Sequence, residues 1–170
     1  MKRLKPTSSI EGKVNIPGSK SVTHRALIAA ALAEGESLLK ECLICEDTLY
    51  TLNALKGLGI SISIENANTL VSGVGGKFPP LPKRKEIYMG NSGTSYRLLL
   101  STVALAQGDI LLSGSPRMQE RPIGSLVSAL NQLGVEATCI GKKDFPPVLI
   151  RANGLPGGSV EIDGDRKSVV

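Results

Sequence analysis

ALKGLGI, at residues 54–60, combines the end of an amphipathic helix with the start of a strand, and ALNQLGV repeats this pattern at residues 129–135. In each copy a glycine, Gly59 or Gly134, follows the last apolar residue of the helix. This is the C′ position, where a left-handed backbone ends the helix and glycine is favoured. Several matched positions at one constant offset predict a structural unit that occurs twice.

The segments around the two copies also match. After each glycine an alternating apolar pattern predicts a strand, with Ile60, Ile62 and Ile64 on one face in the first copy. For the first unit the expected elements are a strand at 13–16, a helix at 20–33, a strand at 37–41, the helix that ends before Gly59, and a hairpin that turns at 66–68. For the second unit they are a strand at 86–89, a helix at 92–106, a strand at 109–113, the helix that ends before Gly134, and a hairpin that turns at 142–147. The prediction is a β-α-β-α-β-β unit present twice in an α/β (α+β) protein with mixed sheets, and residues 159–163 resemble the opening strand of a third unit.

The composition indicates a globular protein with an aliphatic core and anionic ligands. The 170 residues are 41% hydrophobic and 21% charged, which gives no signal of disorder. The net charge of +5 suits anionic partners, but two Phe, three Tyr and no Trp provide little surface for stacking bases. Small anionic substrates are therefore favoured over nucleic acid. Since no apolar run is long enough for a membrane span and the start MKRLKPTSS lacks a secretory signal, we expect a cytoplasmic protein without membrane contacts.

The three cysteines are an odd number, which argues against a disulfide framework. Cys42 and Cys45 form a C-x-x-C pair, but a zinc site would need two further ligands and only Cys139 and His24 remain. We therefore expect buried or half-buried thiols and no metal.

Residues 16–25, IPGSKSVTHR, place a glycine turn, hydroxyls and two cations at the start of a helix. Pro17-Gly18 interrupts the preceding strand, and the unpaired N–H groups and dipole of the following helix favour an anion. Ser21 and Arg25 are four residues apart and project on one helix face, with Lys20 beside them. From these residues alone, a capped surface helix with solvated basic side chains is the alternative.

Residues 88–97, YMGNSGTSYR, repeat this arrangement with a strand, glycines, hydroxyls at a helix start and an arginine one turn inside the helix. Gly90 and Gly93 allow the backbone to approach a ligand closely, and a side chain at Gly93 would intrude. An ordinary loop that caps a helix is the alternative interpretation.

Residues 116–122, PRMQERP, place Arg117 and Arg121 around a helix start, with Pro122 suited to the first helical position. The guanidinium fork of arginine fits carboxylate or phosphate. Either arginine could instead pair with Glu120 or another surface acid.

Three ordered motifs and the repeat make the chain resemble the 5-enolpyruvylshikimate-3-phosphate synthase family, one branch of the enolpyruvyl transferases. Residues 16–37, IPGSKSVTHRALIAAALAEGES, resemble the N-terminal signature of this family. Residues 90–97 match its GN-[AS]-GT-x-x-R pattern, although Leu98 replaces the usual following proline, and Arg121 matches an arginine that binds phosphoenolpyruvate.

The resemblance implies a 3-phosphoshikimate 1-carboxyvinyltransferase, which transfers the enolpyruvyl group of phosphoenolpyruvate to shikimate 3-phosphate, releases phosphate and needs no cofactor. It implies that Lys20 is catalytic and touches both substrates, and that Ser21 and Arg25 hold the shikimate portion. It also implies a phosphoenolpyruvate site lined by Asn91, Gly93, Thr94 and Arg121.

The resemblance further implies how the chain is divided, because each of the two domains in this family contains three β-α-β-α-β-β units. Residues 1–18 would be a strand segment of the first domain, and residues 19–170 an incomplete second domain. Within the second domain the expected units are 19–80, 81–155 and the start of a third at 156–170.

The resemblance ends near Gly164. Where the family continues with Ser-Ser-Gln, which binds the shikimate phosphate, this chain reads DRKSVV at residues 165–170, and only Ser168 aligns with one of the serines. We therefore expect a truncated chain that is inactive without the missing C-terminal portion of the same enzyme. Two alternatives stay open, a UDP-N-acetylglucosamine enolpyruvyl transferase and a non-catalytic anion- or RNA-binding module.

Several charged residues and one histidine are expected to have structural roles. His24 should pack or hydrogen-bond along its helix, and residues 83–85, KRK, should form a solvated loop. Glu46 and Asp47 suit the positive end of a helix, and Arg117 is structural.

Overall fold

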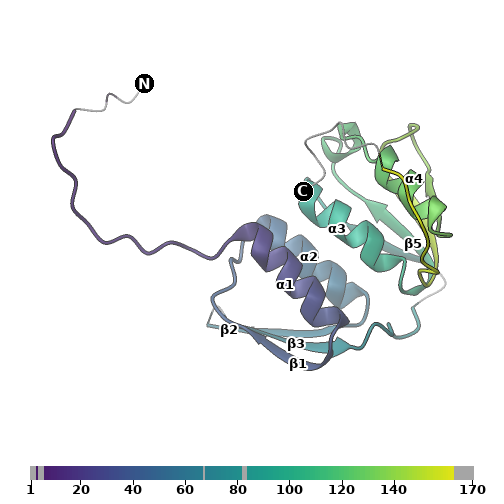
Figure 1. Ribbon diagram of the computed structural model, residues 1–170, viewed down its shortest axis with the longest axis horizontal. Coiled ribbons are helices and arrows are strands. Elements are labelled where there is room, and N and C mark those ends of the chain that lie inside the picture. Colours follow the sequence, from purple (N-terminus) through teal and green to yellow (C-terminus); the bar gives the residue numbers. More distant parts are fainter. Residues whose placement is uncertain (1–2, 4–5, 67, 82–83, 163–170) are drawn as a thin grey trace.

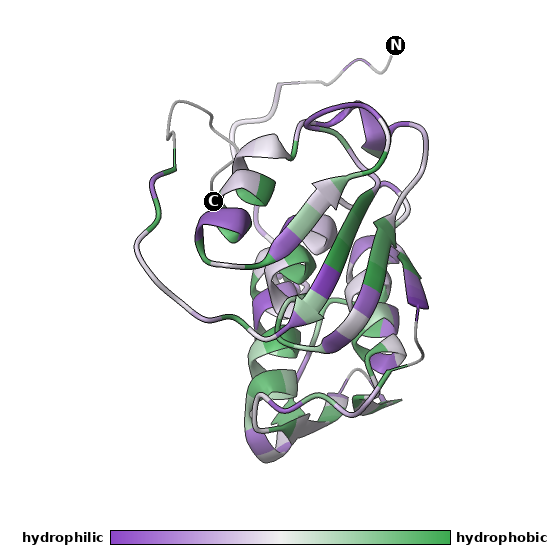
Figure 2. Ribbon diagram, turned by 90° about the vertical axis from the view of Figure 1, so that its right-hand side faces the viewer, coloured by the Kyte–Doolittle hydropathy of each residue, from purple (hydrophilic) through white to green (hydrophobic). Residues whose placement is uncertain are grey.

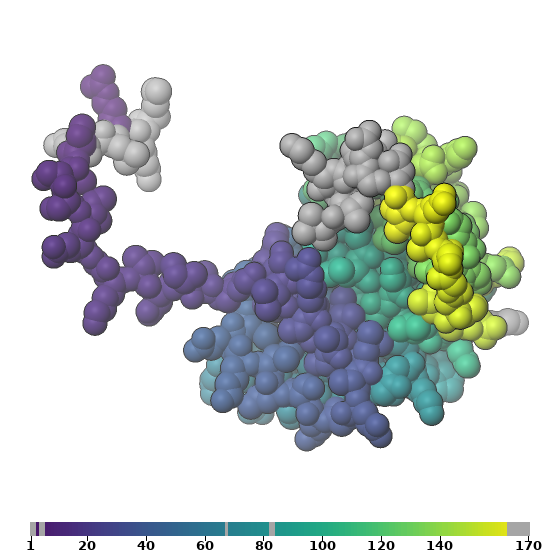
Figure 3. All heavy atoms as spheres, viewed as in Figure 1, coloured from purple at the N-terminus to yellow at the C-terminus, as the bar shows by residue number. Residues whose placement is uncertain are grey.

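A computed structural model describes residues 3, 6–66, 68–81 and 84–162. Three helices, α1 to α3, pack side by side in the middle of the molecule, with a three-stranded sheet against α1 and α2 and a four-stranded sheet beyond α3 (Figure 1). Residues 6–19, before α1, extend away from this body (Figures 1 and 3). None of the helices in the described ranges is both long and apolar enough to cross a membrane.

The first half of the chain forms the three-stranded sheet and the two helices that cover it. Its elements are α1 (Lys20–Leu32), β1 (Glu34–Leu39), α2 (Glu46–Gly57), β2 (Ser61–Glu65) and β3 (Asn68–Val74). The strand order is β1-β3-β2, and both pairs are antiparallel. Ile60 and Ile62 are buried as the alternation predicts, whereas Ile64, near the end of β2, is 39% exposed.

The second half forms the four-stranded sheet and its helices. Its elements are β4 (Arg84–Tyr88), α3 (Gly93–Val103), β5 (Gln107–Ser113), the 3-10 turn η1 (Met118–Glu120), α4 (Gly124–Gln132), β6 (Glu136–Cys139) and β7 (Val148–Asn153). The strand order is β4-β5-β7-β6, in which β4 and β5 are parallel and the other pairs antiparallel. The mixed α/β class is therefore confirmed.

The two helix ends that suggested the repeat have the same hydrogen bonds. In α2, Ile60 N donates to Leu55 O at 3.1 Å, and in α4, Val135 N donates to Leu130 O at 3.0 Å. The intervening glycine has a positive φ in both, +90° at Gly59 and +84° at Gly134. This pattern is the Schellman motif, so the predicted glycine ends are confirmed.

The predicted strands at both ends of the chain are wrong for the described residues. No strand forms at 13–16, where Val14 and Ile16 are 78% and 81% exposed, and none forms at 159–162. A strand is stable only when its backbone groups have a partner strand, and neither segment pairs with one among the described residues. Residue 163, the last of the predicted third-unit strand, lies outside the described ranges.

Two smaller predictions are also corrected. The segment expected as a basic loop contributes Arg84 and Lys85 to strand β4, while residue 83 lies outside the described ranges. Pro122 is not at the first position of a helix, because α4 begins at Gly124 with Ile123 as its N-cap. Arg117 and Arg121 instead flank the short turn η1.

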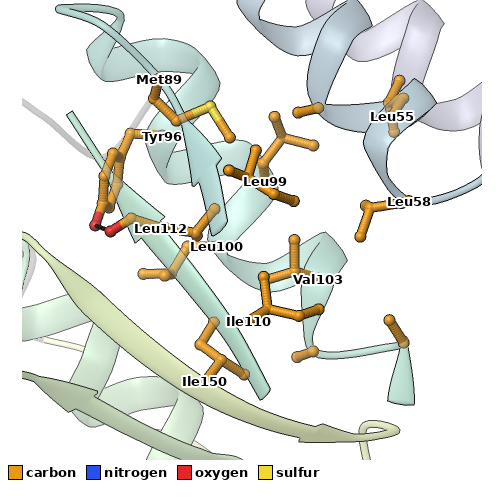
Figure 4. Close-up of a cluster of buried hydrophobic side chains, with 14 of the residues drawn as sticks. Leu55, Leu58, Met89, Tyr96, Leu99, Leu100, Val103, Ile110, Leu112 and Ile150 are labelled. Carbon is orange, nitrogen blue, oxygen red and sulfur yellow. Dashed lines mark hydrogen bonds between the residues drawn. The ribbon is translucent and has the colours of Figure 1, made fainter. Parts of the chain in front are cut away.

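The core is aliphatic, as the composition predicts. Leu55 of α2 and Leu58, the C-cap of that helix, lie opposite Leu99 and Val103 of α3, and all four are 0% exposed (Figure 4). Burial of each such side chain contributes about 1.5–3 kcal/mol. Figure 2 shows that the strands also carry long hydrophobic stretches.

Tyr96 is the one aromatic residue among the core side chains of the described part of the chain. Its hydroxyl donates to Leu112 O at 2.7 Å and accepts from Val148 N at 3.1 Å (Figure 4). Burial raises the pKa of this hydroxyl well above its ordinary value. Tyr96 thus links α3 to two strands of the sheet without leaving a buried polar atom unpaired.

Candidate functional site

The second and third motifs meet because β4 and β5 are parallel. Parallel strands end at the same edge of a sheet, so the loops that follow them start side by side. Two backbone hydrogen bonds join these loops, Met89 N to Ser113 O at 2.9 Å and Ser115 N to Gly90 O at 2.8 Å. The glycine-rich loop before α3 and the arginine-containing turn after β5 therefore form one surface.

The start of α3 is capped and leaves its first backbone groups for a ligand. Ser92 is the N-cap and accepts a hydrogen bond from Ser95 N at 3.3 Å. Gly90 has a φ of +52°, and a Cβ at that position would collide with the ring of Tyr50. The N–H groups that follow Ser92 lie at the positive end of the helix dipole, which favours an anion.

Two arginines lie close together over Gly93. A Cβ on Gly93 would lie 2.6 Å from an Nη of Arg121 and 3.0 Å from an Nη of Arg97, so only glycine leaves these guanidinium groups their positions. Arg97 also donates to Gly93 O at 3.4 Å and Pro122 O at 3.5 Å. Burial, and then the charge of Arg121, lower the pKa of Arg97.

Neither arginine forms an ion pair with a described residue. The ion pairs found in the described ranges join Lys20 to Asp47, Arg117 to Glu120 and Arg151 to Glu136. Two neighbouring guanidinium groups repel each other, and a shared anion would relieve that repulsion while accepting their hydrogen bonds.

Lys20 is held at the opposite side of the site by an acid from the second helix. It is the first residue of α1, after the N-cap Ser19, and its Nζ donates to Asp47 Oδ2 at 2.6 Å. Asp47 is in the first turn of α2, as predicted for the positive end of that helix. The hydrogen bond and charge of Asp47 raise the pKa of Lys20, and the hydrogen bond of Lys20 lowers the pKa of Asp47, so both stay charged.

These groups enclose a pocket of about 350 Å³ at the point where α1, α2 and α3 begin. The pocket is polar and contains more positive than negative side chains. Its lining residues are Lys20, Glu46, Asp47, Tyr50, Asn91, Gly93, Thr94, Arg97 and Arg121. The arrangement can bind a small anion with two separated acidic groups, one at the arginine pair and one nearer Lys20.

The structure brings together five of the eight predicted site residues. Lys20, Asn91, Gly93, Thr94 and Arg121 all line the pocket. Ser21 and Arg25 are exposed on α1 and do not line it, and Ser168 lies outside the described residues.

Sequence reasoning missed four lining residues. Arg97 had a local signal, because it closes the glycine-rich motif four residues after Gly93 and so projects on the same helix face. Asp47 had none that tied it to Lys20, since 27 positions separate the two. Glu46 and Tyr50, joined by a hydrogen bond of 3.2 Å, likewise come from α2.

Of the residues given structural roles, Arg117 and His24 lie outside the pocket, whereas Glu46 and Asp47 line it. Arg117 donates to Glu120 at 2.6 Å and both are well exposed, which confirms the predicted surface pairing. The three cysteines are half-buried free thiols. No group of three or more potential metal ligands occurs within the described ranges. His24 is 0% exposed and hydrogen-bonded, as predicted, although its partner is in α2 rather than along its own helix.

Fold and pocket together define an α/β protein with a polar pocket that is built from helix starts and has more basic than acidic side chains. The family model for EPSP synthase (3-phosphoshikimate 1-carboxyvinyltransferase) matches residues 4–170. The chain belongs to this family.

Individual relatives agree. The 3-phosphoshikimate 1-carboxyvinyltransferase of Shewanella amazonensis is 46% identical over 168 residues, which are 98% of this chain and 39% of the relative. That of Photobacterium profundum is 46% identical over 167 residues, with 97% and 39% covered. An EPSP synthase structure from Acinetobacter baumannii superimposes with a TM-score of 0.75 at 35% identity, covering 82% of this chain and 32% of that one. The chain thus spans about 39% of the length of its curated relatives.

Proposed function

We propose that this chain contributes the phosphoenolpyruvate site of an enzyme that transfers the enolpyruvyl group of phosphoenolpyruvate to shikimate 3-phosphate. The observation that carries the proposal is the pair Arg97 and Arg121, which lies over Gly93 without an acidic partner among the described residues. Phosphoenolpyruvate carries a carboxylate and a phosphate on the same carbon, C2, and each suits a guanidinium fork or the N–H groups at a helix start.

The reaction proceeds by addition and then elimination. The hydroxyl of shikimate 3-phosphate loses its proton as its oxygen bonds to C2 of phosphoenolpyruvate, and a proton adds to C3. The C2–O bond to phosphate then breaks as a proton leaves C3, which restores the double bond and releases phosphate. Lys20 touches both substrates, and its charge, kept by Asp47, stabilises the negative charge that develops during transfer.

The division of the chain follows from the same proposal. Residues 1–18 belong to the first domain of the enzyme and residues 19–170 to an incomplete second domain, with units at 19–80, 81–155 and 156–170. Ser21 and Arg25, exposed on α1, hold the shikimate portion together with Ser168 and the remaining C-terminal portion. The protein acts in the cytoplasm and contacts neither nucleic acid nor membrane.

Calorimetric titration of the chain with phosphoenolpyruvate tests the proposed site. Arg121→Ala and Arg97→Ala should each weaken binding about 10- to 100-fold, because each removes a charge-assisted hydrogen-bond donor. Arg117→Ala is the matched control, since Arg117 is four positions from Arg121, exposed, and paired with Glu120. It should change the dissociation constant less than about twofold.

Equal losses in all three variants would mean that general surface charge, rather than the arginine pair, attracts the ligand. Titrations with shikimate 3-phosphate, UDP-N-acetylglucosamine and an RNA oligomer separate the alternatives. Binding of the nucleotide sugar or of RNA in preference to shikimate 3-phosphate would contradict the proposed function.

A further inference from the structure

A chain of buried hydrogen bonds crosses the three central helices. His24 Nδ1 in α1 lies 2.7 Å from Thr51 Oγ1 in α2, which lies 2.9 Å from Ser95 Oγ in α3. All three residues are 0% exposed. Because these groups have no surface in contact with bulk solvent, the donors and acceptors along the chain are matched to one another.

The far end of the chain determines that order. Ser95 Oγ lies 2.9 Å from the backbone carbonyl oxygen of Asp47, which can only accept, so the single hydroxyl proton of Ser95 is used there. Ser95 must then accept from Thr51, and Thr51 has no proton left for the imidazole. Thr51 therefore accepts from His24, and the proton of the imidazole is on Nδ1.

The other imidazole nitrogen supports a neutral ring. Nε2 of His24 is buried and has no hydrogen-bond partner among the described residues. A proton on this atom would add a buried positive charge with no acceptor beside it, which costs more than the unpaired lone pair of the neutral ring. Burial accordingly lowers the pKa of His24.

The chain ends at the walls of the pocket. Ser95 holds the backbone of Asp47, whose carboxylate accepts from Lys20 at 2.6 Å. Ser92, whose Oγ is 2.7 Å from Ser95 Oγ, is the N-cap of α3 and lies between the pocket residues Asn91 and Gly93.

We propose that His24 is a positioning residue of the pocket: its Nδ1–H orients the hydroxyls of Thr51 and Ser95, which hold the start of α2 so that Asp47 keeps Lys20 at the pocket wall. The identity of the ligand rests on the proposed function, but the proton order and its link to Asp47 do not.

NMR of the imidazole tests the proton order directly, because His24 is the single histidine of the sequence. A long-range ¹H–¹⁵N spectrum at pH 7 should show a protonated Nδ1 and an unprotonated Nε2. A proton on Nε2, or on both nitrogens, overturns the inference whether or not the chain binds phosphoenolpyruvate.

Substitutions at Thr51 test the link to the pocket. Thr51→Val removes the hydroxyl and should raise the pKa of the Asp47 carboxyl, followed by ¹³C NMR, and weaken phosphoenolpyruvate binding about tenfold. Thr51→Ser restores the hydroxyl and should restore both values. Thr102→Val is the matched control. Like Thr51, Thr102 is a buried helical threonine, but it lies in α3 and donates to Leu98 O at 3.0 Å, so it takes no part in the chain of hydrogen bonds from His24.

An unchanged Asp47 pKa in folded Thr51→Val overturns the link. If that variant does not fold, Ser95→Ala decides, because Ser95 joins Thr51 to the backbone of Asp47 and its loss should also raise the pKa of the Asp47 carboxyl. An unchanged Asp47 pKa in Ser95→Ala overturns the link. Failure of the wild-type chain to bind phosphoenolpyruvate contradicts the proposed function alone.

Discussion

At the scale of single residues, the pocket depends on groups that are absent as much as on groups that are present. Gly93 leaves room for Arg97 and Arg121, which a single added carbon would displace. His24 shows the opposite case, because its buried imidazole supplies the first donor of a chain of hydrogen bonds that runs through Thr51 and Ser95. Each residue has a neighbour that is distant in the sequence, Arg121 for Gly93 and Thr51 for His24.

Burial of His24 should make the stability of the protein depend on pH. Burial lowers its pKa in the folded state, Lys20 and Arg25 lower it further, and Asp47 opposes them. Below pH about 6.5 the unfolded chain binds a proton that the folded chain does not. The free energy of unfolding therefore decreases as the pH is lowered, until the pH reaches the pKa of His24 in the folded state. Urea unfolding should show a lower free energy of unfolding at pH 5.5 than at pH 7.5.

His24→Asn is the control for this pH dependence, since it keeps an N–H donor for Thr51 but does not titrate. The decrease in the free energy of unfolding between pH 7.5 and 5.5 should be absent from this variant. An equal decrease in both proteins would show that a group other than His24 causes it. Asp47 does not contribute in this range, because its pKa is lowered chiefly by Lys20 and its stabilising effect is lost only at more acidic pH.

At the scale of elements, helix starts and helix ends carry different functions. The starts of α1, α2 and α3 meet at the pocket, where their positive dipole ends and unpaired N–H groups face one space. The ends of α2 and α4 carry the Schellman glycines that turn the chain into the following strands. This arrangement places ligand binding at one end of the helices and strand formation at the other.

Two glycines at the end of α2 should respond oppositely to alanine. Gly57 is helical and a Cβ would meet only Lys85 Cε, at 3.6 Å, so Gly57→Ala should stabilise by about 0.5–1 kcal/mol. Gly59 has a φ of +90° and a Cβ would collide with Pro79, so Gly59→Ala should destabilise by about 1–3 kcal/mol. Chemical unfolding of both variants at pH 7 measures this difference. A stabilising Gly59→Ala would contradict the left-handed helix end.

At the scale of the whole molecule, the pocket combines elements from both halves of the chain. Lys20 and Asp47 come from the half that carries the three-stranded sheet, and Gly93, Arg97 and Arg121 from the half that carries the four-stranded sheet. The packing of α1, α2 and α3 against one another therefore sets the distance between the lysine and the arginines. Neither half contains the pocket alone.

The proposed function predicts that this chain binds phosphoenolpyruvate but does not turn it over. Catalysis needs both substrates, and the chain spans about 39% of the length of its curated relatives. Phosphate release should be undetectable with the purified chain and should appear when the remaining C-terminal portion of a relative is supplied. Turnover by the purified chain alone would show that the described pocket suffices.

The sequence by itself determined the features that depend on a few neighbouring residues. Capping hydroxyls at Ser19 and Ser92 and the helix-ending glycines Gly59 and Gly134 act within one helical turn, so local patterns predicted the α/β class and most elements. Strand 13–16 was predicted from the same kind of pattern and does not form, because a strand also requires a partner.

Only the tertiary structure decided which helix starts meet and which charges face each other. Three kinds of contact join residues that are 24 to 44 positions apart. They are the ion pair of Lys20 with Asp47, the proximity of Arg97 to Arg121, and the single hydrogen bonds of Thr51 with His24 and with Ser95. Such contacts depend on how the helices pack against one another. That packing is set by the aliphatic core as a whole, and no short stretch of sequence specifies it.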